Sequence, residues 1–529
     1  MRLTRTCVTC AVVVLATLAM PVLHATAASR TFIIASSANP TTLNPVLTTE
    51  FPAHFTSAMI FNSLVTTTLD LRTEADLAES WTVSPDGLTY TFTLRDGVKW
   101  HDGKPFTAQD VKFTADELWK KYAPHGPSVF ANIDVVSVIA PRTVVFKLKT
   151  RFAPLMTYLG TPYFSPILPK HLYEGTDVLK NDYNAKPVGT GPFVFEEWRR
   201  GQHIKVKKNA AYFKKGLPLL ESAVVQIMPD EPSRLRALEK GEIDMAVLIP
   251  NHVVPKWQRS SEIGVTSETW KSFASLGWIF VNMRSPLVGG LDDKGRKVRQ
   301  ALYHTLDRKA VVEKVYFGAA KVASGPINSG HGFAFKPGLP SYDFDPTRAE
   351  KLLDEAGYPR KADGVRFKLN MPVTVSRAEF SKVPELWRED LKKVGIDLNL
   401  TTSDDPAFLD RTFKQWDYDV FYTTPYTGPD PSVSAARFYI TSNIKKAAFT
   451  NASGYSNPRV DELFQQAQTE VDPEIRKRAF WEIQDILVRD LPGLWILEIK
   501  WHDAYRSRFK NVGLSPFGPA DSRERVDLK

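Results

Sequence analysis

The first 27 residues constrain this chain more than any other segment, because they carry its only two cysteines, Cys7 and Cys10, and are typical of a leader. A basic start is followed by an apolar run over residues 10–20, a proline and small residues at 25–27. This order predicts a secretory signal peptide cleaved near Ala27, and the run is shorter than the about 20 residues that span a bilayer. The exported chain then has no cysteine for a disulfide, so hydrophobic cores must hold the fold together.

The length of the remaining chain requires more than one core. About 500 residues would remain, whereas a single hydrophobic core stops growing at roughly 250–300 residues. The composition, with 43% hydrophobic and 24% charged residues, is that of an ordinary globular protein. No cysteine follows the apolar run, so the leader lacks the thiol that a lipid anchor needs. We expect at least two lobes, in a periplasmic protein without a lipid anchor.

The charge of the chain is mild for its size. The formal net charge is +9, and the clusters of Lys and Arg, such as those at 205–208 and 214–215, are short and have acids nearby. Nucleic-acid binding would need a basic stripe in a recognisable module. We therefore expect no nucleic-acid partner.

An alternation of apolar and polar residues with period two predicts a small sheet early in the chain. Asp-Gly turns at 86–87 and 96–97 bracket its first strand. Thr107 with Asp110 begins a helix that we expect to cover the sheet. The residues on the buried faces of two predicted strands are Leu88, Tyr90, Phe92 and Leu94, and Val144, Phe146 and Leu148.

The rest of the chain mixes strands and helices, which predicts an α/β fold with a mixed or parallel sheet. Apolar runs predict strands over residues 193–198, 224–227, 245–249, 278–283 and 495–499, with a helix over 232–240. Three more helices begin with an Asp or Asn cap followed by proline, at Asp345-Pro346, Asn457-Pro458 and Asp472-Pro473. No low-complexity linker is present, so we expect crossing strands or short hinges between the lobes.

The sequence offers no metal-ligand spacing and no serine nucleophile elbow. The ten histidines show no metal-ligand spacing, and the serine-nucleophile signature Gly-x-Ser-x-Gly does not occur. Gly189-Thr190-Gly191 lacks the Lys-Ser/Thr of a phosphate-binding loop and is interpreted as a tight backbone corner. We expect no cofactor, no metal and no enzymatic activity, although other nucleophiles stay open.

A loop rich in aromatic and polar residues is a candidate ligand site. Residues 416–431 are typical of a strand that runs into a proline-rich loop, and loops at strand ends concentrate ligand groups. Tyr426, Thr427 and Asp430 lie in this loop. These three residues either touch a ligand or pack inside the protein.

Several blocks of the sequence resemble one known family. They are LAESW at 77–81, SPDG at 84–87, LRDGVKWHDG at 94–103, PVGTGPF at 187–193, GEID at 241–244, VRQAL at 298–302 and the Asp430-Pro431 loop. Across about residues 30–505, and in this order, they resemble the extracellular solute-binding proteins of the dipeptide/oligopeptide/nickel class. Members of that family serve ATP-driven ABC importers.

The resemblance implies a two-lobed clamshell that closes over a solute by hinge motion. One lobe carries an extra β-rich domain, and the chain crosses between the lobes more than once. After the signal peptide at 1–27, the implied boundaries are 28–70, 187–284 and 500–529 for lobe I, 71–186 for the extra sheet domain, and 285–499 for lobe II.

The resemblance also implies how a ligand is held. Peptide-binding members hold the amino terminus of the peptide with an aspartate three residues before an acidic-Pro pair. The pair here is Asp430-Pro431, and the aligned residue is Thr427. A carboxylate-to-ammonium hydrogen bond is worth roughly 1.5–3 kcal/mol, and a neutral threonine cannot replace its charge. Either another acid takes this role, with Glu50 as the candidate, or the solute is not a free-amine peptide.

The expected ligand-binding residues come from three parts of the sequence. Glu50 and Phe51 lie in a loop that aligns with pocket residues of the first lobe in the family. Trp278 and Arg284 bracket a strand near the implied lobe crossing, and the fork of an arginine suits a ligand carboxylate. The full set is Glu50, Phe51, Trp278, Arg284, Tyr426, Thr427 and Asp430.

The function implied by the resemblance is that of a periplasmic substrate-binding protein. It would capture a peptide-like or other small polar solute between its lobes and deliver it to an ABC importer. Oligopeptides, dipeptides, opines, sugar conjugates and metal chelates are all candidate solutes. The expected partners are this solute and the membrane permease subunits, and we expect a monomer.

Two alternatives stay open. A secreted hydrolase with an unrecognised carboxylate pair would turn its substrate over. An exported chaperone or docking protein would bind unfolded chains rather than small solutes. A binding protein would instead bind one solute stoichiometrically and release it unchanged.

Overall fold

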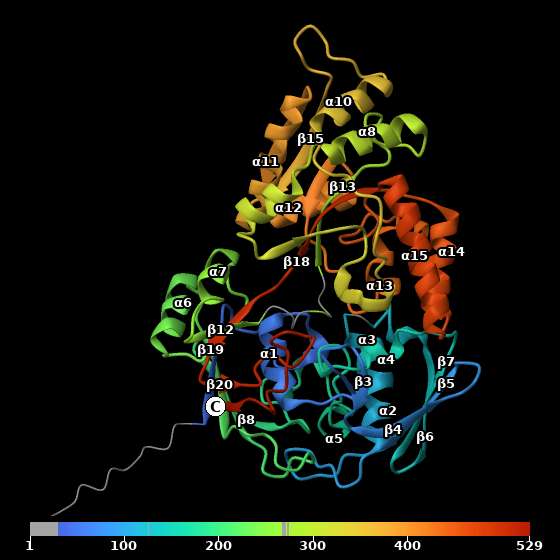
Figure 1. Ribbon diagram of the computed structural model, residues 1–529. Coiled ribbons are helices and arrows are strands. Elements are labelled where there is room, and N and C mark those ends of the chain that lie inside the picture. The colour runs from blue at the N-terminus through green and yellow to red at the C-terminus, as the bar shows by residue number, and fades with distance from the viewer. Residues whose placement is uncertain (1–29, 125, 267–270, 272–274) are drawn as a thin grey trace, which may run out of the picture.

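The computed structural model describes residues 30–124, 126–266, 271 and 275–529. The predicted signal peptide, with its cleavage point near Ala27, lies outside the described residues. Two lobes stand one above the other and are joined by strands at one side (Figure 1), which confirms the predicted two-lobed α/β fold. Within the described ranges, no helix is both long and apolar enough to cross a bilayer.

A mixed sheet of seven strands forms the centre of lobe I. The helices and strands of lobe I are β1 (Thr31–Ser36), α1 (Phe51–Ile60), β8 (Phe193–Arg199), β9 (His203–Lys208), β10 (Ser222–Ile227), α6 (Glu231–Lys240), β11 (Met245–Ala246), α7 (Val254–Trp257), β12 (Ile263–Thr266), β19 (Asp503–Arg506), β20 (Phe509–Lys510) and β21 (Asp527–Leu528). β20 and β21 pair with each other outside the seven-stranded sheet. The strand order is β12-β19-β11-β1-β10-β9-β8. β1 runs parallel to β10 and β11, while β19 lies antiparallel between β11 and β12. Segments from near both ends of the described chain, β1 and β19, therefore lie in one sheet.

The extra domain is an antiparallel sheet of four strands in the order β4-β5-β7-β6. The elements from residue 65 to the end of this domain are β2 (Val65–Thr67), β3 (Thr73–Ala75), β4 (Ala78–Val83), β5 (Thr89–Leu94), α2 (Ala108–Phe113), α3 (Lys120–Tyr122), β6 (Ile133–Ala140), β7 (Thr143–Leu148), α4 (Leu155–Tyr158) and α5 (Lys170–Tyr173). β2, which lies before the implied boundary at 71, pairs with β3 in a separate two-stranded sheet. The predicted capping box between Thr107 and Asp110 begins α2. The alternation in β5 and β7 buries the predicted faces, and the domain shares one hydrophobic core with lobe I.

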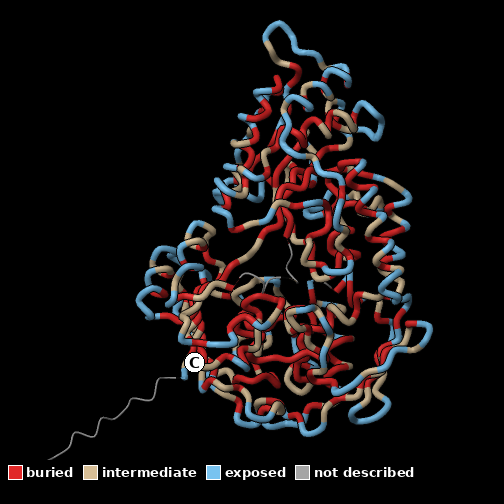
Figure 2. Tube along the Cα trace, in the orientation of Figure 1, coloured by how far each residue is buried: buried red, intermediate tan, exposed pale blue. Residues whose placement is uncertain are grey.

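Lobe II contains the longest helices. Its elements are β13 (Ser275–Val281), α8 (Asp293–His304), α9 (Arg308–Ala310), β14 (Ala320–Val322), α10 (Pro346–Glu355), β15 (Phe367–Thr374), α11 (Ala378–Lys393), β16 (Ile396–Ser403), α12 (Asp405–Leu409), β17 (Val420–Thr423), α13 (Pro431–Ser434), α14 (Pro458–Thr469), α15 (Pro473–Asp490) and β18 (Gly493–Ile499). One sheet has the order β14-β18-β13-β17, and β15 pairs in parallel with β16. The helices α10, α14 and α15 begin at the predicted cap-proline pairs. Lobe II has its own core (Figure 2).

Strand pairing corrects two sequence predictions. The strand expected at the end of lobe I is β13, which pairs with β17 and β18 of lobe II. Lobe II therefore starts near residue 275 rather than at 285, because the apolar run alone cannot say which sheet receives it. The strand predicted over 245–249 comprises only Met245–Ala246, since Leu248 adopts a left-handed backbone with φ 52°.

The lobes are connected at one side and touch at the other. β18 belongs to the sheet of lobe II and β19 to that of lobe I, so residues 500–502 cross between them (Figure 1). On the opposite side, the backbone N–H of Ala153 in the extra domain donates a hydrogen bond of 2.9 Å to the carbonyl of Gln468 at the end of α14. The space between these two connections holds the candidate site.

Gly189-Thr190-Gly191 forms the predicted tight corner. The N–H of Gly191 donates to the carbonyl of Ile60 at the end of α1, at 2.8 Å, and the carbonyl of Gly189 accepts from the N–H of His101 at 2.9 Å. The corner thus joins lobe I to the extra domain. A Cβ at position 189 would lie far inside contact distance of the Ile60 carbonyl oxygen.

We expect Gly189→Ala to lower the free energy of unfolding by about 1–3 kcal/mol. The loss should lie near the upper end of this range, because the added methyl group would clash with a backbone carbonyl rather than with a side chain that can move. Chemical denaturation of the solute-free protein measures this loss. Gly330→Ala is the control, because its Cβ would meet only the side-chain oxygen of Asn328, at 3.1 Å. Equal stability of the two variants would contradict the assignment of the corner as a packed junction.

Candidate functional site

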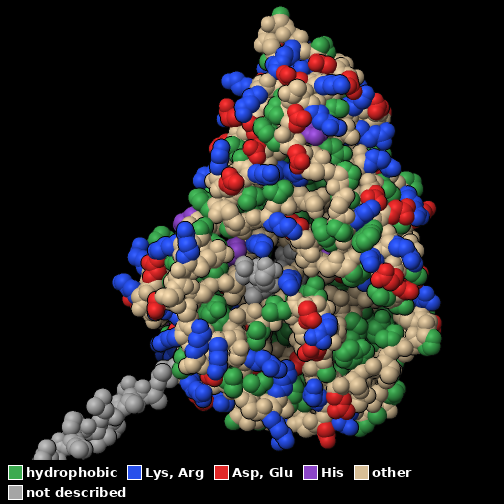
Figure 3. Space-filling model, in the orientation of Figure 1, with side chains coloured by type: hydrophobic (Ala, Val, Ile, Leu, Met, Phe, Trp, Pro, Cys, Tyr) green, Lys and Arg blue, Asp and Glu red, His purple; other side chains and the backbone are tan. Residues whose placement is uncertain are grey.

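A cavity of about 990 Å³ lies between the two lobes, where the surface is hollowed (Figure 3). Lobe I contributes Thr49, Phe51 and residues 248–252, and the extra domain contributes Tyr163. The start of α11 and the loop after β17 line the opposite side. Ile499 at the end of β18 and the crossing residues 500–502 also line the cavity. A molecule in this cavity would touch both lobes and the connection between them.

Aromatic rings form the wall on the side of lobe I. The rings of Phe51 and Tyr163 lie 6.1 Å apart, and Tyr163 lies 3.9 Å from the imidazole of His54. The Tyr163 hydroxyl donates a hydrogen bond of 3.2 Å to the carbonyl of Thr49. Tyr426 of lobe II also lines the cavity and packs against the core of lobe I. These contacts create a rigid apolar surface for the body of a ligand.

One tyrosine forms part of the opposite wall and is backed by a second, buried tyrosine. The hydroxyls of Tyr316 and Tyr422 lie 2.9 Å apart. Burial raises the pKa of both above the usual value, so both hydroxyls stay protonated at neutral pH. Tyr316 lines the cavity, whereas Tyr422 lies behind it as a fully buried residue.

Charged side chains of both signs face the cavity. Arg377, Glu379 and Lys382 come from the start of α11, Lys500 from the crossing segment and Glu231 from the start of α6. The guanidinium of Arg377 lies over the ring of Trp501, with 5.0 Å between its central carbon and the ring centroid. Such a lining can bind the charged ends of a polar solute while the aromatic wall contacts its body.

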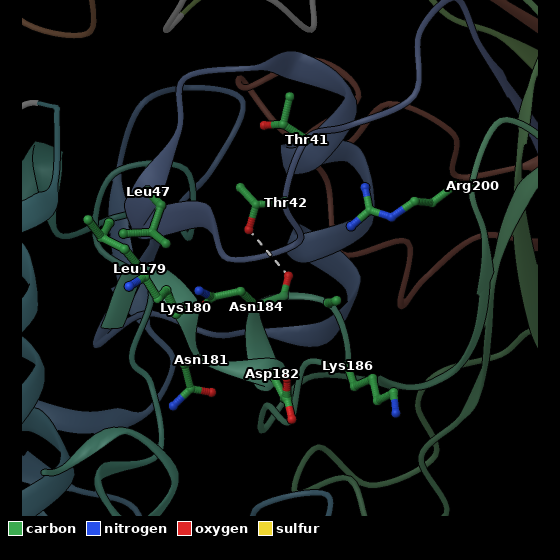
Figure 4. A pocket seen from close by; sticks show the side chains of 11 residues that line it. Thr41, Thr42, Leu47, Leu179, Lys180, Asn181, Asp182, Asn184, Lys186 and Arg200 are labelled. Atoms are coloured by element: carbon green, nitrogen blue, oxygen red, sulfur yellow. Dashed lines mark hydrogen bonds between the residues drawn. The ribbon is translucent and has the colours of Figure 1, made fainter. Parts of the chain in front are cut away.

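The structure brings two of the predicted ligand residues, Phe51 and Tyr426, into the wall of this cavity. Glu50 is adjacent in sequence but points elsewhere: its carboxylate accepts hydrogen bonds from the N–H and the hydroxyl of Thr41, at 2.9 Å and 3.1 Å. Thr41 lines a separate cavity of about 430 Å³ between lobe I and residues 179–186 of the extra domain (Figure 4). Among the residues described as lining the inter-lobe cavity, Glu50 is absent.

Asp430 and Thr427 lie behind the cavity wall. Asp430 is 4% exposed, and its carboxylate forms an ion pair of 2.7 Å with Arg476 of α15 and accepts from the N–H of Ser432 at 3.0 Å. Thr427 is fully buried, with its hydroxyl 3.5 Å from Nε2 of His331. Burial lowers the pKa of His331 to about 4, so this imidazole is neutral at neutral pH.

Trp278 and Arg284 are likewise placed away from the described lining of the cavity. Trp278, in β13, is 1% exposed and packs on Phe280 with ring centroids 4.7 Å apart. Arg284 lies beyond the end of β13, where its guanidinium stacks on Trp416 at 3.8 Å and donates to the carbonyl of Ala452 at 3.0 Å. Both residues hold lobe II together at these contacts.

Sequence reasoning missed the charged cluster at the start of α11 and the crossing residue Trp501. One signal could have found the cluster: residues 375–382 follow the carboxyl end of the buried strand β15, where ligand groups concentrate. The crossing segment at 500–502 has no such signal. Its position depends on the strands that pair with β18 and β19, and these strands are far away in sequence. In the described part of the chain, no group of three or more His, Cys, Asp or Glu side chains is placed to hold a metal ion.

Comparisons with known proteins agree with this geometry. Residues 72–446 match the sequence profile of the family described as bacterial extracellular solute-binding proteins, family 5 Middle. The glutathione-binding protein GsiB of Salmonella typhi is 28% identical over 513 residues, which cover 95% of each chain.

Two solved structures have a similar fold. HbpA2 from Haemophilus parasuis superposes with a TM-score of 0.81 at 25% identity, over 94% of this chain and 100% of that chain. The ABC transporter substrate-binding protein CtaP from Listeria monocytogenes gives 0.81 at 26% identity, over 94% of this chain and 99% of that chain.

Proposed function

The chain belongs to the bacterial extracellular solute-binding proteins of family 5, and from this premise we propose that the cavity between its lobes captures the solute. The protein binds a small solute outside the cytoplasm and hands it to an ABC importer. The expected secretory leader agrees with this location. Its cleavage near Ala27 and the absence of a lipid anchor are part of the proposal.

The assignment of the site rests on one observation: residues from several parts of the fold line the same cavity. Both lobes, the extra domain and the crossing segment contribute to one space of about 990 Å³. A solute bound there contacts both lobes at once, so its binding energy favours the conformation in which the lobes are together. Closure of this kind presents a loaded binding protein to the permease.

The lining favours a small peptide-like solute. Phe51, Tyr163 and Tyr426 offer flat apolar surfaces, and charged groups of both signs lie in the same cavity. A peptide has an apolar body and ends of opposite charge, which such a cavity can accommodate. The relative GsiB is named a glutathione-binding protein, so glutathione is the first solute to test. Opines and metal chelates are further candidates.

Members of the family are binding proteins rather than enzymes, and we infer stoichiometric binding without turnover for this chain. The proposed partners are the solute and the permease subunits of an ABC importer, with the binding protein as a monomer. The hydrolase alternative has no support in the family.

A thermal-shift panel on the mature protein tests this function. The panel contains glutathione, di- and oligopeptides, opines, sugars and nickel chelates, and a solute at 100 times its Kd adds about 2.7 kcal/mol to the free energy of unfolding. Titration calorimetry should then give one solute per chain, and mass spectrometry should recover the solute unchanged. No shift with any solute class, or a chemically altered solute, would refute the proposal.

A further inference from the structure

We propose that Glu379 is the partner of a positively charged amino group on the solute, so that the solute is a peptide-like molecule with a free amine. This inference rests on the proposed function of the inter-lobe cavity. It identifies the group of this chain that would supply the negative charge missing at Thr427. The argument starts from the carboxylates near the cavity.

The acids of the aromatic loop and of α1 are already engaged. Asp430 is buried and pairs with Arg476 at 2.7 Å, and Glu50 accepts two hydrogen bonds from Thr41. Neither residue lines the cavity. Among the described lining residues, the carboxylates are those of Glu231 and Glu379, one from each lobe.

The surroundings favour Glu379 over Glu231. Glu231 is exposed in the first turn of α6, where water screens its charge. Glu379 is half-buried, and its charge acts on the buried hydroxyls of Tyr316 and Tyr422, whose pKa it helps to raise. An ion pair in this less polar environment is stronger than one at the surface.

The carboxylate of Glu379 is available for a ligand. Within the described residues, no hydrogen bond or ion pair engages it, although Arg377 lies only two positions earlier. Arg377 instead places its guanidinium over the ring of Trp501 at 5.0 Å and near that of Phe380 at 6.0 Å. Neither Arg377 nor Lys382, the nearest cations in sequence, forms an ion pair with this carboxylate among the described contacts.

The aromatic rings around Glu379 suit an ammonium group. Tyr316, Phe380 and Trp501 line the same cavity as Glu379, and the contacts of Arg377 show that two of these rings already accept a cation. An ammonium beside an aromatic face gains attraction from the ring quadrupole in addition to the carboxylate. The lining as a whole has three Lys or Arg residues and two acids, so the remaining charge on the solute is negative, as at the other end of a peptide.

The test compares free-amine peptides with their N-acetylated forms by titration calorimetry. The probes are Ala-Ala, Ala-Ala-Ala and glutathione, each in both forms, against the wild type and Glu379→Gln. We expect at least one free-amine probe to bind the wild type and its acetylated form to bind at least 10-fold more weakly. Glu379→Gln should weaken the free-amine probe by about 10- to 100-fold and leave the acetylated probe unchanged.

Two variants with the same chemical change serve as controls. Glu385→Gln lies on an exposed part of α11 outside the cavity lining and should bind like the wild type, as should Glu50→Gln. Glu231→Gln tests the other carboxylate of the lining and should weaken binding of the free-amine probe less than Glu379→Gln does. The thermal midpoint of solute-free Glu379→Gln should match that of the wild type, which shows that the fold is intact.

The outcomes separate the two proposals. Wild-type affinity in Glu379→Gln, or a loss in Glu231→Gln or Glu50→Gln instead, would overturn the inference and leave the proposed function standing. Binding only of solutes without an amine would do the same. Failure of every solute class to bind the wild type would overturn the proposed function itself.

Discussion

Asp430→Asn lowers the free energy of unfolding of the solute-free protein by about 3–5 kcal/mol, the usual cost of removing one partner of a buried ion pair. The carboxylate and its partner Arg476 are both buried and lie 2.7 Å apart. An asparagine can still accept the hydrogen bond from the N–H of Ser432, so the loss measures the charge alone. Urea denaturation gives the value.

A surface ion pair provides the matched control for this substitution. Asp485 and Lys336 lie 2.6 Å apart with the Asp485 side chain 50% exposed, so Asp485→Asn should cost at most about 1 kcal/mol. If Asp430→Asn kept the full stability but lost solute affinity, Asp430 would be a ligand residue rather than a structural one.

Trp278→Ala is expected to be as damaging, with a loss of about 3–5 kcal/mol for an aromatic residue deleted from a core. Trp278 is 1% exposed in the sheet of lobe II, with the ring of Phe438 edge-on at 5.3 Å and that of Tyr439 at 6.1 Å. Denaturation of the solute-free protein measures the effect independently of binding.

The half-buried Trp481 is the control for this deletion. Its indole donates to the carbonyl of Phe335 at 3.2 Å, but it lies outside the fully buried core, so Trp481→Ala should cost less. A Trp278→Ala variant with normal stability and reduced solute affinity would contradict the core assignment and return Trp278 to the ligand site.

The local elements of the fold could be predicted because their signals lie within a few residues of one another. The cap-proline pairs at 345–346, 457–458 and 472–473 begin helices where they were expected, since a cap satisfies the N–H groups of the next turn. The alternation in β5 likewise places its own side chains on two faces of a sheet. Neither signal depends on distant parts of the chain.

The membership of β13 in lobe II could not be predicted in this way. Its run of seven buried residues shows that the strand is covered on both faces, but not which neighbours pair with it. Strand pairing joins residues more than 100 positions apart, as Phe280 and Phe421 show. The boundary between the lobes was therefore placed too late in the sequence.

The sequence by itself determined the family, the α/β class and the local elements, because these depend on motifs and on near neighbours along the chain. Only the tertiary structure decided which side chains face the cavity. Glu50 and Phe51 are consecutive, yet one turns to Thr41 and the other lines the cavity. Glu379 and Trp501 meet in the same cavity from more than 100 residues apart. The direction of a side chain is set by the packing of all surrounding segments, and this packing exists only once both lobes have folded.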